Sequence, residues 1–235
     1  MKFKRGHIYP GLFICSEGPD GSGKTTQFGR KNEYLKNLGY EVVEVREPGG
    51  TFIGEKIRKI LLDPDNKDEI SDYTEMLLFM ASRTQLLYQK IIPALKEGKI
   101  VSADRFVWST EAYQGYGAGM SLKNIKKVES AVLDKVYPDL TIVYDVDTDT
   151  ALKRMSPILR GENLDRIESK GVELQEKVRN GYLNISKENP YNFIVIDSTP
   201  SADEIQKKVI FTLEELLVKT GLNKTLTRKS ITSKA

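Results

Sequence analysis

The sequence contains one cysteine and one histidine in 235 residues. Cys15 cannot form an internal disulfide, and His7 alone cannot build a histidine-based metal site or a Ser-His-Asp triad. No hydrophobic run approaches the length of a membrane span, and the basic N-terminus leads into a strand and turn rather than a small-residue cleavage site. We therefore expect a cytoplasmic protein with no membrane partner.

An excess of charge of one sign is also lacking, because 36 Lys and Arg residues face 33 Asp and Glu and give a formal net charge of +3. So small a charge does not argue for a nucleic acid partner, and we expect none. The basic excess lies at the ends, since residues 1–16 and 219–235 carry Lys and Arg but no Asp or Glu. We interpret residues 222–235 as a disordered basic tail.

Runs of branched apolar residues alternate with stretches of helical period, which is typical of a βαβ protein with a parallel sheet. The apolar runs predict strands at residues 12–16, 41–46, 100–103, 140–146 and 193–196. The periodic stretches predict helices at residues 24–38, 73–97, 122–135, 148–157, 171–188 and 202–219. The pattern therefore predicts a single α/β domain over residues 1–221, with helices flanking a parallel sheet of five strands.

A glycine-rich segment lies between the first predicted strand and the first predicted helix. It reads Gly-Pro-Asp-Gly-Ser-Gly-Lys-Thr and fits the P-loop pattern G-x-x-x-x-G-K-[ST]. Glycines let backbone N–H groups surround phosphates, and the following helix adds its positive N-terminal end. We expect Lys24 to reach the β- and γ-phosphates and the Thr25 hydroxyl to bind Mg²⁺. The segment predicts a three-layer P-loop fold with an ATP site at Gly18, Pro19, Asp20, Gly21, Ser22, Gly23, Lys24, Thr25 and Thr26.

A P-loop identifies a nucleoside triphosphate site but leaves the reaction open. A GTPase would carry Asn-Lys-x-Asp to read guanine, whereas residues 223–226 read Asn-Lys-Thr-Leu. The sequence therefore does not favour a GTPase.

Arginines stand where a second phosphate site would need them, at the ends of predicted strands. Arg46 opens the segment Arg-Glu-Pro-Gly-Gly-Thr after the second strand, and Arg105 follows Asp104 after the third. Phe79 and Arg83 lie four residues apart, on one face of the helix between these strands. The segment Ser-Thr-Glu-Ala-Tyr-Gln-Gly follows at residues 109–115.

Together these motifs resemble the thymidylate kinase family. The matching segments keep the family's order and spacing and cover residues 17–27, 46–51, 78–83, 104–105 and 109–115. The resemblance extends over about residues 11–215. It implies a core of five parallel strands, Mg-ATP as phosphate donor, dTMP as acceptor and dTDP as product. Because the family is often dimeric, we also expect a homodimer.

The resemblance assigns the acceptor monophosphate to Arg46, Arg58 and Arg105, and the sugar 3′-hydroxyl to Asp20. Lys24, Arg46 and Arg105 would act in catalysis by neutralising and aligning the phosphates. The competing interpretation of Arg58 is a solvated charge on a helix.

The resemblance also implies how the nucleoside would be read. Phe79 would stack on thymine, and Arg83 would donate to a carbonyl oxygen of the base. Thr110 and Gln114 would read the remaining polar edge, and Tyr113 would press against the 2′ position of the sugar. The competing interpretation places the two aromatic rings in the hydrophobic core.

A polar, glycine-containing stretch after the fourth strand, about residues 157–170, is interpreted as a lid. In this family the arginine that neutralises the transferring phosphate comes from the P-loop or from the lid. The P-loop here has glycine at that position, so the resemblance implies the lid arrangement typical of bacterial members. Asn163 interrupts the family's Arg-Gly-x-Leu-Asp-Arg spacing and leaves Arg160 and Arg166 as alternatives, of which we favour Arg160. Arg154, nearby, is assigned to ATP.

Three alternatives stay open at this point. Asp104 is either an outer-sphere ligand of Mg²⁺ or the N-terminal cap of the following turn. The enzyme could be a deoxynucleoside kinase, for which Glu17 is the obvious candidate for a carboxylate base. A P-loop ATPase or nucleic-acid-binding module that uses the basic ends is the third alternative.

Overall fold

The computed structural model describes residues 3–66, 69–160 and 165–222. Its strands are β1 (Leu12–Glu17), β2 (Val42–Arg46), β3 (Ile100–Asp104), β4 (Leu140–Asp145) and β5 (Phe193–Asp197). They form one sheet of five parallel strands in the order β2-β3-β1-β4-β5. The predicted α/β fold is confirmed.

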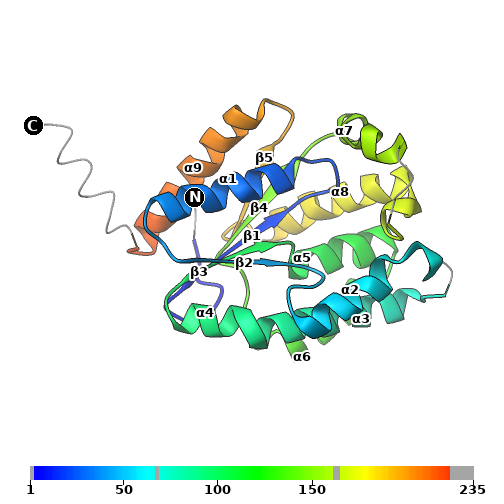
Figure 1. Ribbon diagram of the computed structural model, residues 1–235, viewed down its shortest axis with the longest axis horizontal. Coiled ribbons are helices and arrows are strands. Elements are labelled where there is room, and N and C mark those ends of the chain that lie inside the picture. Colours follow the sequence, from blue (N-terminus) through cyan, green and yellow to red (C-terminus); the bar gives the residue numbers. More distant parts are fainter. Residues whose placement is uncertain (1–2, 67–68, 161–164, 223–235) are drawn as a thin grey trace, which may run out of the picture.

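Helices cover both faces of this sheet. They are α1 (Lys24–Asn37), α2 (Phe52–Leu62), α3 (Asp72–Leu86), α4 (Ile92–Lys96), α5 (Val107–Thr110), α6 (Leu122–Val132), α7 (Thr148–Arg160), α8 (Val172–Glu188) and α9 (Ala202–Lys219). Figure 1 shows α1 and α9 together on one side of the sheet and α3, α4 and α6 on the other. Among the described residues, no helix is long and apolar enough to cross a membrane.

The strand sequences explain the layered core, because successive side chains point to opposite faces of a sheet. On β1, Leu12 and Ile14 belong to the hydrophobic cluster beneath α1 and α9, whereas Phe13 and Cys15 belong to the cluster beneath the helices of the other face. Every residue of β1 is buried. A central parallel strand covered on both faces is expected to be apolar throughout, as this one is apart from its last two residues.

The register brings the carboxyl ends of three strands level with one another. Asp104 of β3 lies opposite Ser16 of β1 on one side and Arg46 of β2 on the other. The loops that follow these strands therefore start at the same edge of the sheet, where open α/β sheets place their ligands.

Helix bounds differ from the predictions where the local pattern is irregular. The helix predicted over residues 73–97 is divided by a π-helical segment, η2 (Leu87–Ile91), directly before α4, where Pro93 cannot donate a backbone hydrogen bond. Helix α2 was not predicted. Neither were α5 and the π-helical segment η3 (Glu111–Gly117) that continues it, and this segment contains residues of low helix propensity. Short 3₁₀ turns lie at η1 (Pro64–Asn66) and η4 (Glu168–Lys170).

Lys31 is an unusual part of the interface between α1 and the sheet, because it is fully buried. Its Nζ donates to Ser102 Oγ at 2.9 Å and lies 5.0 Å from the centroid of the Phe28 ring. Burial disfavours the charged amine and lowers the pKa of Lys31 to about 8. The folded protein therefore holds a titratable amine beneath its P-loop helix.

The stability of the protein should depend on pH through Lys31. Between about pH 8 and the ordinary lysine pKa of 10.5, the unfolded chain binds a proton that the folded chain has released, so the free energy of unfolding rises with pH. Lys31→Met removes this contribution. The difference in unfolding free energy, parent minus variant, should increase by about 1 kcal/mol per pH unit between about pH 8 and 10. Urea unfolding at several pH values measures it, and a constant difference would contradict the assignment.

Candidate functional site

The predicted P-loop connects β1 to α1, and its glycines are required by its geometry. Gly18 and Gly21 have φ angles of 144° and 76°. A Cβ atom at Gly18 would lie 2.5 Å from Tyr144 O, and one at Gly21 would lie 2.5 Å from Ala151 O. Any larger residue would therefore clash with backbone as well as strain the chain.

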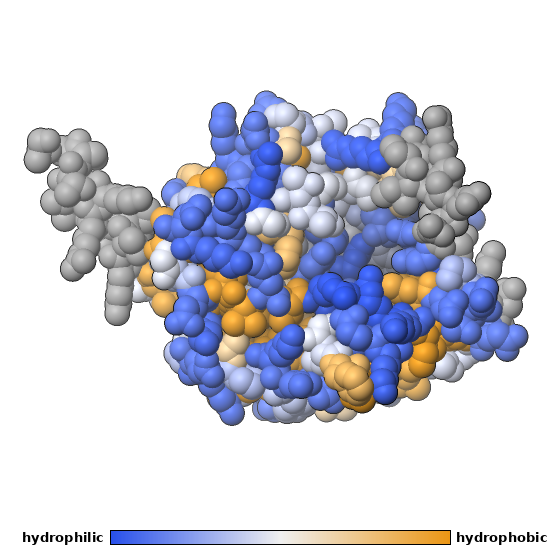
Figure 2. Space-filling model, viewed as in Figure 1, coloured by the Kyte–Doolittle hydropathy of each residue, from blue (hydrophilic) through white to orange (hydrophobic). Residues whose placement is uncertain are grey.

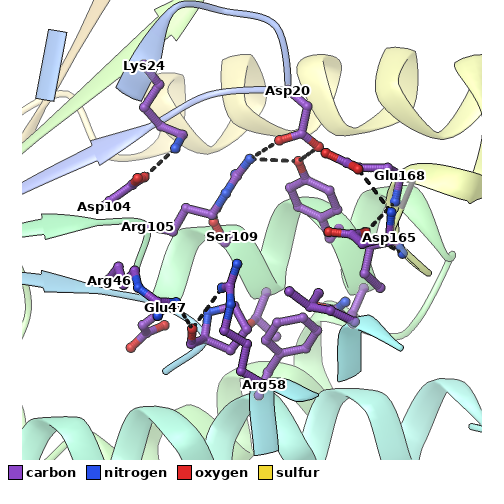
Figure 3. Close-up of a pocket in the computed structure, with 17 residues that line it drawn as sticks. Asp20, Lys24, Arg46, Glu47, Arg58, Asp104, Arg105, Ser109, Asp165 and Glu168 are labelled. Atoms are coloured by element: carbon purple, nitrogen blue, oxygen red, sulfur yellow. Dashed lines mark hydrogen bonds and ion pairs between the residues drawn. The ribbon is translucent and has the colours of Figure 1, made fainter. Parts of the chain in front are cut away.

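Lys24 begins α1 and is buried, and its Nζ forms an ion pair with the carboxylate of Asp104 at the end of β3 (Figure 3). Burial lowers the pKa of Lys24 and nearby Arg105 adds to the effect, while Asp104 opposes it. Helix α5 has Phe106 as its N-cap residue, and no described side chain caps it. The capping alternative for Asp104 is therefore wrong.

A cavity of about 230 Å³ lies beyond these strand ends. It brings together ten of the predicted site residues: Asp20, Lys24, Arg46, Arg58, Phe79, Asp104, Arg105, Thr110, Tyr113 and Gln114. The rest of the lining consists of residues to which the sequence analysis assigned no binding role: Glu47, Pro48, Leu62, Ser109, Asp165, Ile167 and Glu168. In the space-filling view, hydrophilic side chains surround a hollow between the part that carries α1 and α7 and the part that carries α2 and α3 (Figure 2).

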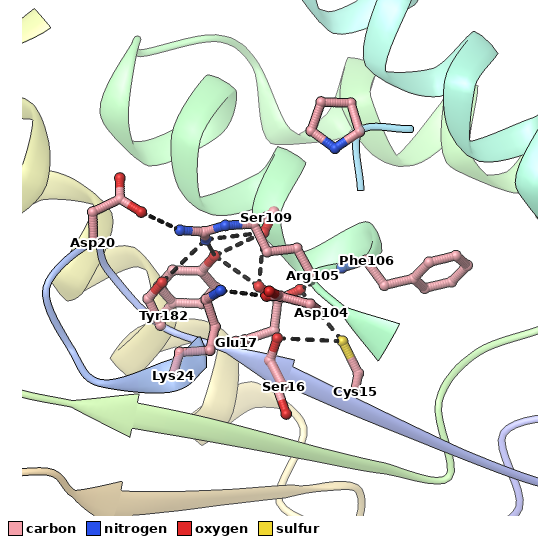
Figure 4. Close-up of polar contacts among 12 residues, drawn as sticks. Cys15, Ser16, Glu17, Asp20, Lys24, Asp104, Arg105, Phe106, Ser109 and Tyr182 are labelled. Atoms are coloured by element: carbon pink, nitrogen blue, oxygen red, sulfur yellow. Dashed lines mark hydrogen bonds and ion pairs between the residues drawn. The ribbon is translucent and has the colours of Figure 1, made fainter. Parts of the chain in front are cut away.

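Arg105 occupies the centre of the polar contacts in this cavity (Figure 4). Its Nη1 donates to Gly18 O and to Tyr182 Oη, both at 3.0 Å. Its Nη2 donates to the Asp20 carboxylate and to Tyr113 Oη, the latter at 3.1 Å. Although burial disfavours the charge, these neighbours raise the pKa of Arg105 well above its ordinary value. The guanidinium is therefore charged, and both of its Nη atoms are hydrogen-bonded.

Asp20 is the anionic partner of Arg105 within the P-loop. Its Oδ2 also accepts from Tyr113 Oη at 3.0 Å and from Gln175 Nε2 at 3.1 Å. Burial alone would raise the pKa of Asp20, but Arg105 and Lys24 outweigh it and lower the pKa. The carboxylate is ionised at neutral pH.

Two further arginines line the cavity on the side of α2. Arg46 Nη2 donates to both carboxylate oxygens of Glu55, at 3.0 and 2.9 Å, and Arg58 Nη1 donates to Pro48 O at 2.9 Å. The carboxylate of Glu55 also accepts from Gly50 N at 2.7 Å, which ties the loop after β2 to α2. Arg58 faces the cavity and is half-buried, in contrast to a solvated helix charge.

Arg83 is 1% exposed and is not among the described residues that line the cavity. Its Nε and Nη2 both donate to Glu47 Oε2, at 2.8 and 2.7 Å, and Nη2 also donates to Phe106 O at 3.0 Å. Its Nη1 donates to Thr110 Oγ1 at 2.9 Å and to Met80 Sδ at 3.4 Å. A contact between Arg83 and thymine would have to replace one of these bonds, and it stays a prediction.

Three of the predicted base-reading side chains line the cavity, from α3, α5 and η3: Phe79, Thr110 and Gln114. Phe79 is only partly buried and lines the cavity, so it is not simply a core residue. Gln114 Nε2 donates to Glu75 Oε1 at 2.8 Å, which fixes the orientation of its amide.

Of the two lid arginines, the structure describes the side chain of Arg166. Arg166 is 1% exposed; its Nε donates to Leu61 O at 2.7 Å, and its Nη2 forms an ion pair with Glu75. Arg160 ends α7, but its side chain lies outside the described residues, as do residues 161–164. Arg154 Nη2 donates to Ser198 O at 2.9 Å. Thr25 and Thr26 are exposed at the start of α1.

Glu17, the candidate base of the deoxynucleoside kinase alternative, is fully buried at the end of β1. It accepts hydrogen bonds from Phe106 N at 2.8 Å, Ser109 Oγ at 2.7 Å and Tyr182 Oη at 2.8 Å. It is not among the described residues that line the cavity. A carboxylate so occupied is not placed to accept a proton from a substrate.

Sequence reasoning missed three polar residues of α8 that face the strand ends. Gln175 bonds to Asp20, Tyr182 bonds to Glu17, and Arg179 donates to Asp145 at 2.7 and 3.0 Å. Their spacing of four and three residues, which puts all three on one helix face, was a signal that could have revealed them.

Comparison with known proteins agrees with this geometry. The family model described as thymidylate kinase matches residues 16–209. The chain is 44% identical over 207 residues to a thymidylate kinase of Caldanaerobacter subterraneus subsp. tengcongensis, covering 88% of this chain and 97% of the relative. It is 45% identical over 199 residues to that of Kosmotoga olearia, covering 85% and 93%. The crystal structure of thymidylate kinase from Ehrlichia chaffeensis superposes with a TM-score of 0.70 at 35% identity, covering 86% of this chain and 98% of that one. This chain belongs to the thymidylate kinase family, whose members are kinases that phosphorylate dTMP to dTDP with ATP as co-substrate.

Proposed function

We propose that this chain carries out the family's reaction in the cavity described above, with the triphosphate of Mg-ATP in the P-loop and dTMP on the arginine side. The observation that supports this most directly is that one cavity joins Lys24 of the P-loop to Arg46, Arg58 and Arg105. Guanidinium groups suit a phosphate because their planar fork binds two oxygens. A nucleoside has no phosphate to hold, so the deoxynucleoside kinase alternative is wrong.

The reaction needs no general base, since the acceptor phosphate oxygen is already ionised at neutral pH. Positioning and charge neutralisation lower the barrier instead. Lys24 would neutralise charge on the donor phosphates, and Arg46 and Arg105 would align the acceptor phosphate despite its repulsion from ATP. Closure of the lid would exclude water, because hydrolysis of ATP is the competing reaction.

The oxygen groups beside the P-loop fit Mg²⁺, which is commonly held by one or two carboxylates together with substrate phosphates. The Thr25 hydroxyl is exposed at the start of α1, and the Asp104 carboxylate lines the cavity. We assign Thr25 and Asp104 to hold the ion, which when bound supplies further neutralisation of phosphate charge. Asp104 would then exchange Lys24 for Mg²⁺. Among the described residues, no cluster of three or more His, Cys, Asp or Glu could bind a metal without the nucleotide.

The same cavity offers one aromatic face and several fixed polar groups for the nucleoside. Phe79 would stack on thymine, and Thr110, Gln114 and Arg83 would satisfy its polar edge. Tyr113, whose hydroxyl is fixed by Asp20 and Arg105, would contact the sugar.

We further propose that two copies associate through α2 and α3. Large apolar side chains are exposed on both helices, including Phe52 at 74%, Tyr73 at 54% and Leu77 at 51%. Large apolar side chains left exposed favour association with another protein surface. The cytoplasmic location expected from the sequence stays a prediction.

A coupled assay of ADP release tests the substrate assignment. With Mg-ATP, dTMP should be the best acceptor among dTMP, dUMP, dGMP and thymidine, because only dTMP offers both the phosphate and the methylated base. Lys24→Met serves as the inactive control and should lose turnover by about 10² or more. Turnover of thymidine without turnover of dTMP would contradict the proposal.

Tyr113→Ala should relax the discrimination between dTMP and ribothymidine monophosphate. If the ring excludes a 2′-hydroxyl, removing the ring relieves overpacking of about 1–3 kcal/mol. The kcat/KM for dTMP divided by that for ribothymidine monophosphate should then fall about tenfold. Tyr113→Phe is the matched control, since it keeps the ring and should keep the discrimination. An unchanged ratio in Tyr113→Ala would place the residue in a structural role only.

Arg160→Ala and Arg166→Ala should differ in kind. The arginine that engages the transferring phosphate should lose about 10² to 10³ in kcat when removed, with little change in nucleotide affinity, and we assign this role to Arg160. Arg166→Ala should instead lower the free energy of unfolding by about 3 kcal/mol, because Glu75 loses a buried partner. Steady-state kinetics, nucleotide titration and urea unfolding of both variants measure this. A kcat within a few-fold of the parent in both would end the lid-arginine mechanism.

A further inference from the structure

The backbone at Arg105 is in a conformation that must be held in place. Its φ of 67° lies in the left-handed region, which costs a residue with a side chain about 1–3 kcal/mol. Two hydrogen bonds to β1 fix this turn: Arg105 N donates to Ser16 O at 3.0 Å, and Phe106 N donates to Glu17 Oε1 at 2.8 Å. One oxygen of Glu17 therefore accepts from the backbone N–H that follows Arg105.

The second oxygen of Glu17 sets the direction of two hydroxyl groups. Ser109 Oγ and Tyr182 Oη each carry one proton and lie 2.9 Å apart, where either could donate to the other. The charged carboxylate is the stronger acceptor and draws both protons to Glu17 Oε2, at 2.7 and 2.8 Å. Their lone pairs are then left to accept from Arg105 Nη1, which lies 3.0 Å from Tyr182 Oη and 3.4 Å from Ser109 Oγ. Burial and the Glu17 carboxylate raise the pKa of Tyr182 well above its ordinary value, so the phenol keeps the proton that this arrangement requires.

These contacts join four elements far apart in the sequence. Glu17 ends β1, Arg105 follows β3, Ser109 lies on α5 and Tyr182 lies on α8. Figure 4 shows the four side chains converging, with Asp20 on the far side of the guanidinium. Glu17 and Tyr182 are both fully buried, and neither is among the described residues that line the cavity. They can act on a substrate only through the groups that they contact, which are Arg105 and the cavity-lining Ser109, itself 3.4 Å from Arg105 Nη1.

From this geometry we infer that Tyr182 and Glu17 are positioning residues for the acceptor phosphate, which they align by fixing both the backbone and the guanidinium of Arg105. The inference rests on the proposed role of Arg105 in binding dTMP. This role differs from a role in folding alone, because removing either residue must then weaken the binding of dTMP and not that of ATP.

Tyr182→Phe tests this with the removal of a single oxygen. The KM for dTMP should rise about tenfold, the magnitude of one lost hydrogen bond to a charged group, while the KM for ATP stays within about twofold. Tyr116→Phe is the matched control. Tyr116 lies on η3, and its side chain packs closely against Gly181 of α8. Its hydroxyl has no hydrogen-bond partner among the described residues. It should leave both KM values unchanged.

Glu17→Gln should be more harmful than Tyr182→Phe. If the amide oxygen of the variant keeps the bond from Phe106 N, its NH₂ group faces Ser109 and Tyr182. Their hydroxyl protons must then turn away from it, toward the Arg105 guanidinium. In the parent these two hydroxyl oxygens accept from that guanidinium. The KM for dTMP should therefore rise more than tenfold, about 30-fold or more, again with little change for ATP. Equal losses for both substrates in the two variants would overturn the inference and leave a structural role.

Arg105→Ala, made alone and with Tyr182→Phe, separates the inference from the proposed function. If Arg105→Ala leaves the KM for dTMP unchanged, the proposed role of Arg105 fails. If Arg105→Ala raises this KM and Tyr182→Phe adds nothing to it, Tyr182 acts through Arg105 as inferred. A full additional tenfold rise in the double variant would mean that Tyr182 acts independently, and the inference would be wrong.

Discussion

The site depends on one physical constraint, which is that buried positive charge must be balanced whether or not a phosphate is bound. Moving an unpaired ammonium or guanidinium out of water costs several kcal/mol, so each such group needs an anionic or carbonyl partner. In this structure Lys24 pairs with Asp104, and Arg105 pairs with Asp20. Arg58, half-buried, donates to a carbonyl oxygen instead. A phosphate that enters the cavity therefore exchanges partners for these cations and does not meet free charges. The affinity for each substrate is a difference between its own contacts and those it replaces.

Asp20 and Asp104 differ from Glu17 in their depth below the cavity, which follows from where each lies relative to the sheet. Asp20 and Asp104 line the cavity, where a ligand can reach them. Glu17 lies one layer deeper, at the end of a strand whose residues are all buried, and its oxygens accept from Phe106 N, Tyr182 and Ser109, of which only Ser109 lines the cavity. Asp20 and Asp104 pair with the cations when no phosphate is bound and can give way to a phosphate that enters. The buried acid keeps Arg105 in one orientation throughout.

Much of this arrangement could be read from the sequence because its signals are local. The P-loop is one contiguous segment between an apolar strand and a helix, and Phe79 is placed by its spacing from Arg83 on a helix. Contacts made by burial were harder to foresee. Arg83 is enclosed by its partners, and this could not be foreseen because nothing near it in the sequence shows that Glu47 will lie beside it. Tyr182 was missed for the same reason, since its partners Glu17 and Arg105 are distant in the chain.

The same charge balance explains why the acceptor must itself carry a phosphate. Thymidine would gain the aromatic face of Phe79 and some polar contacts, but it would leave Arg46 and Arg105 in the ion pairs that they already make. It would thus bury its sugar hydroxyl beside closed ion pairs. A monophosphate brings a second anion into the same cavity, which is tolerated because its oxygens can replace the carboxylates as partners of the guanidinium groups. Selection for dTMP over thymidine is therefore built into the pairing of the cations, before any contact with the base is considered.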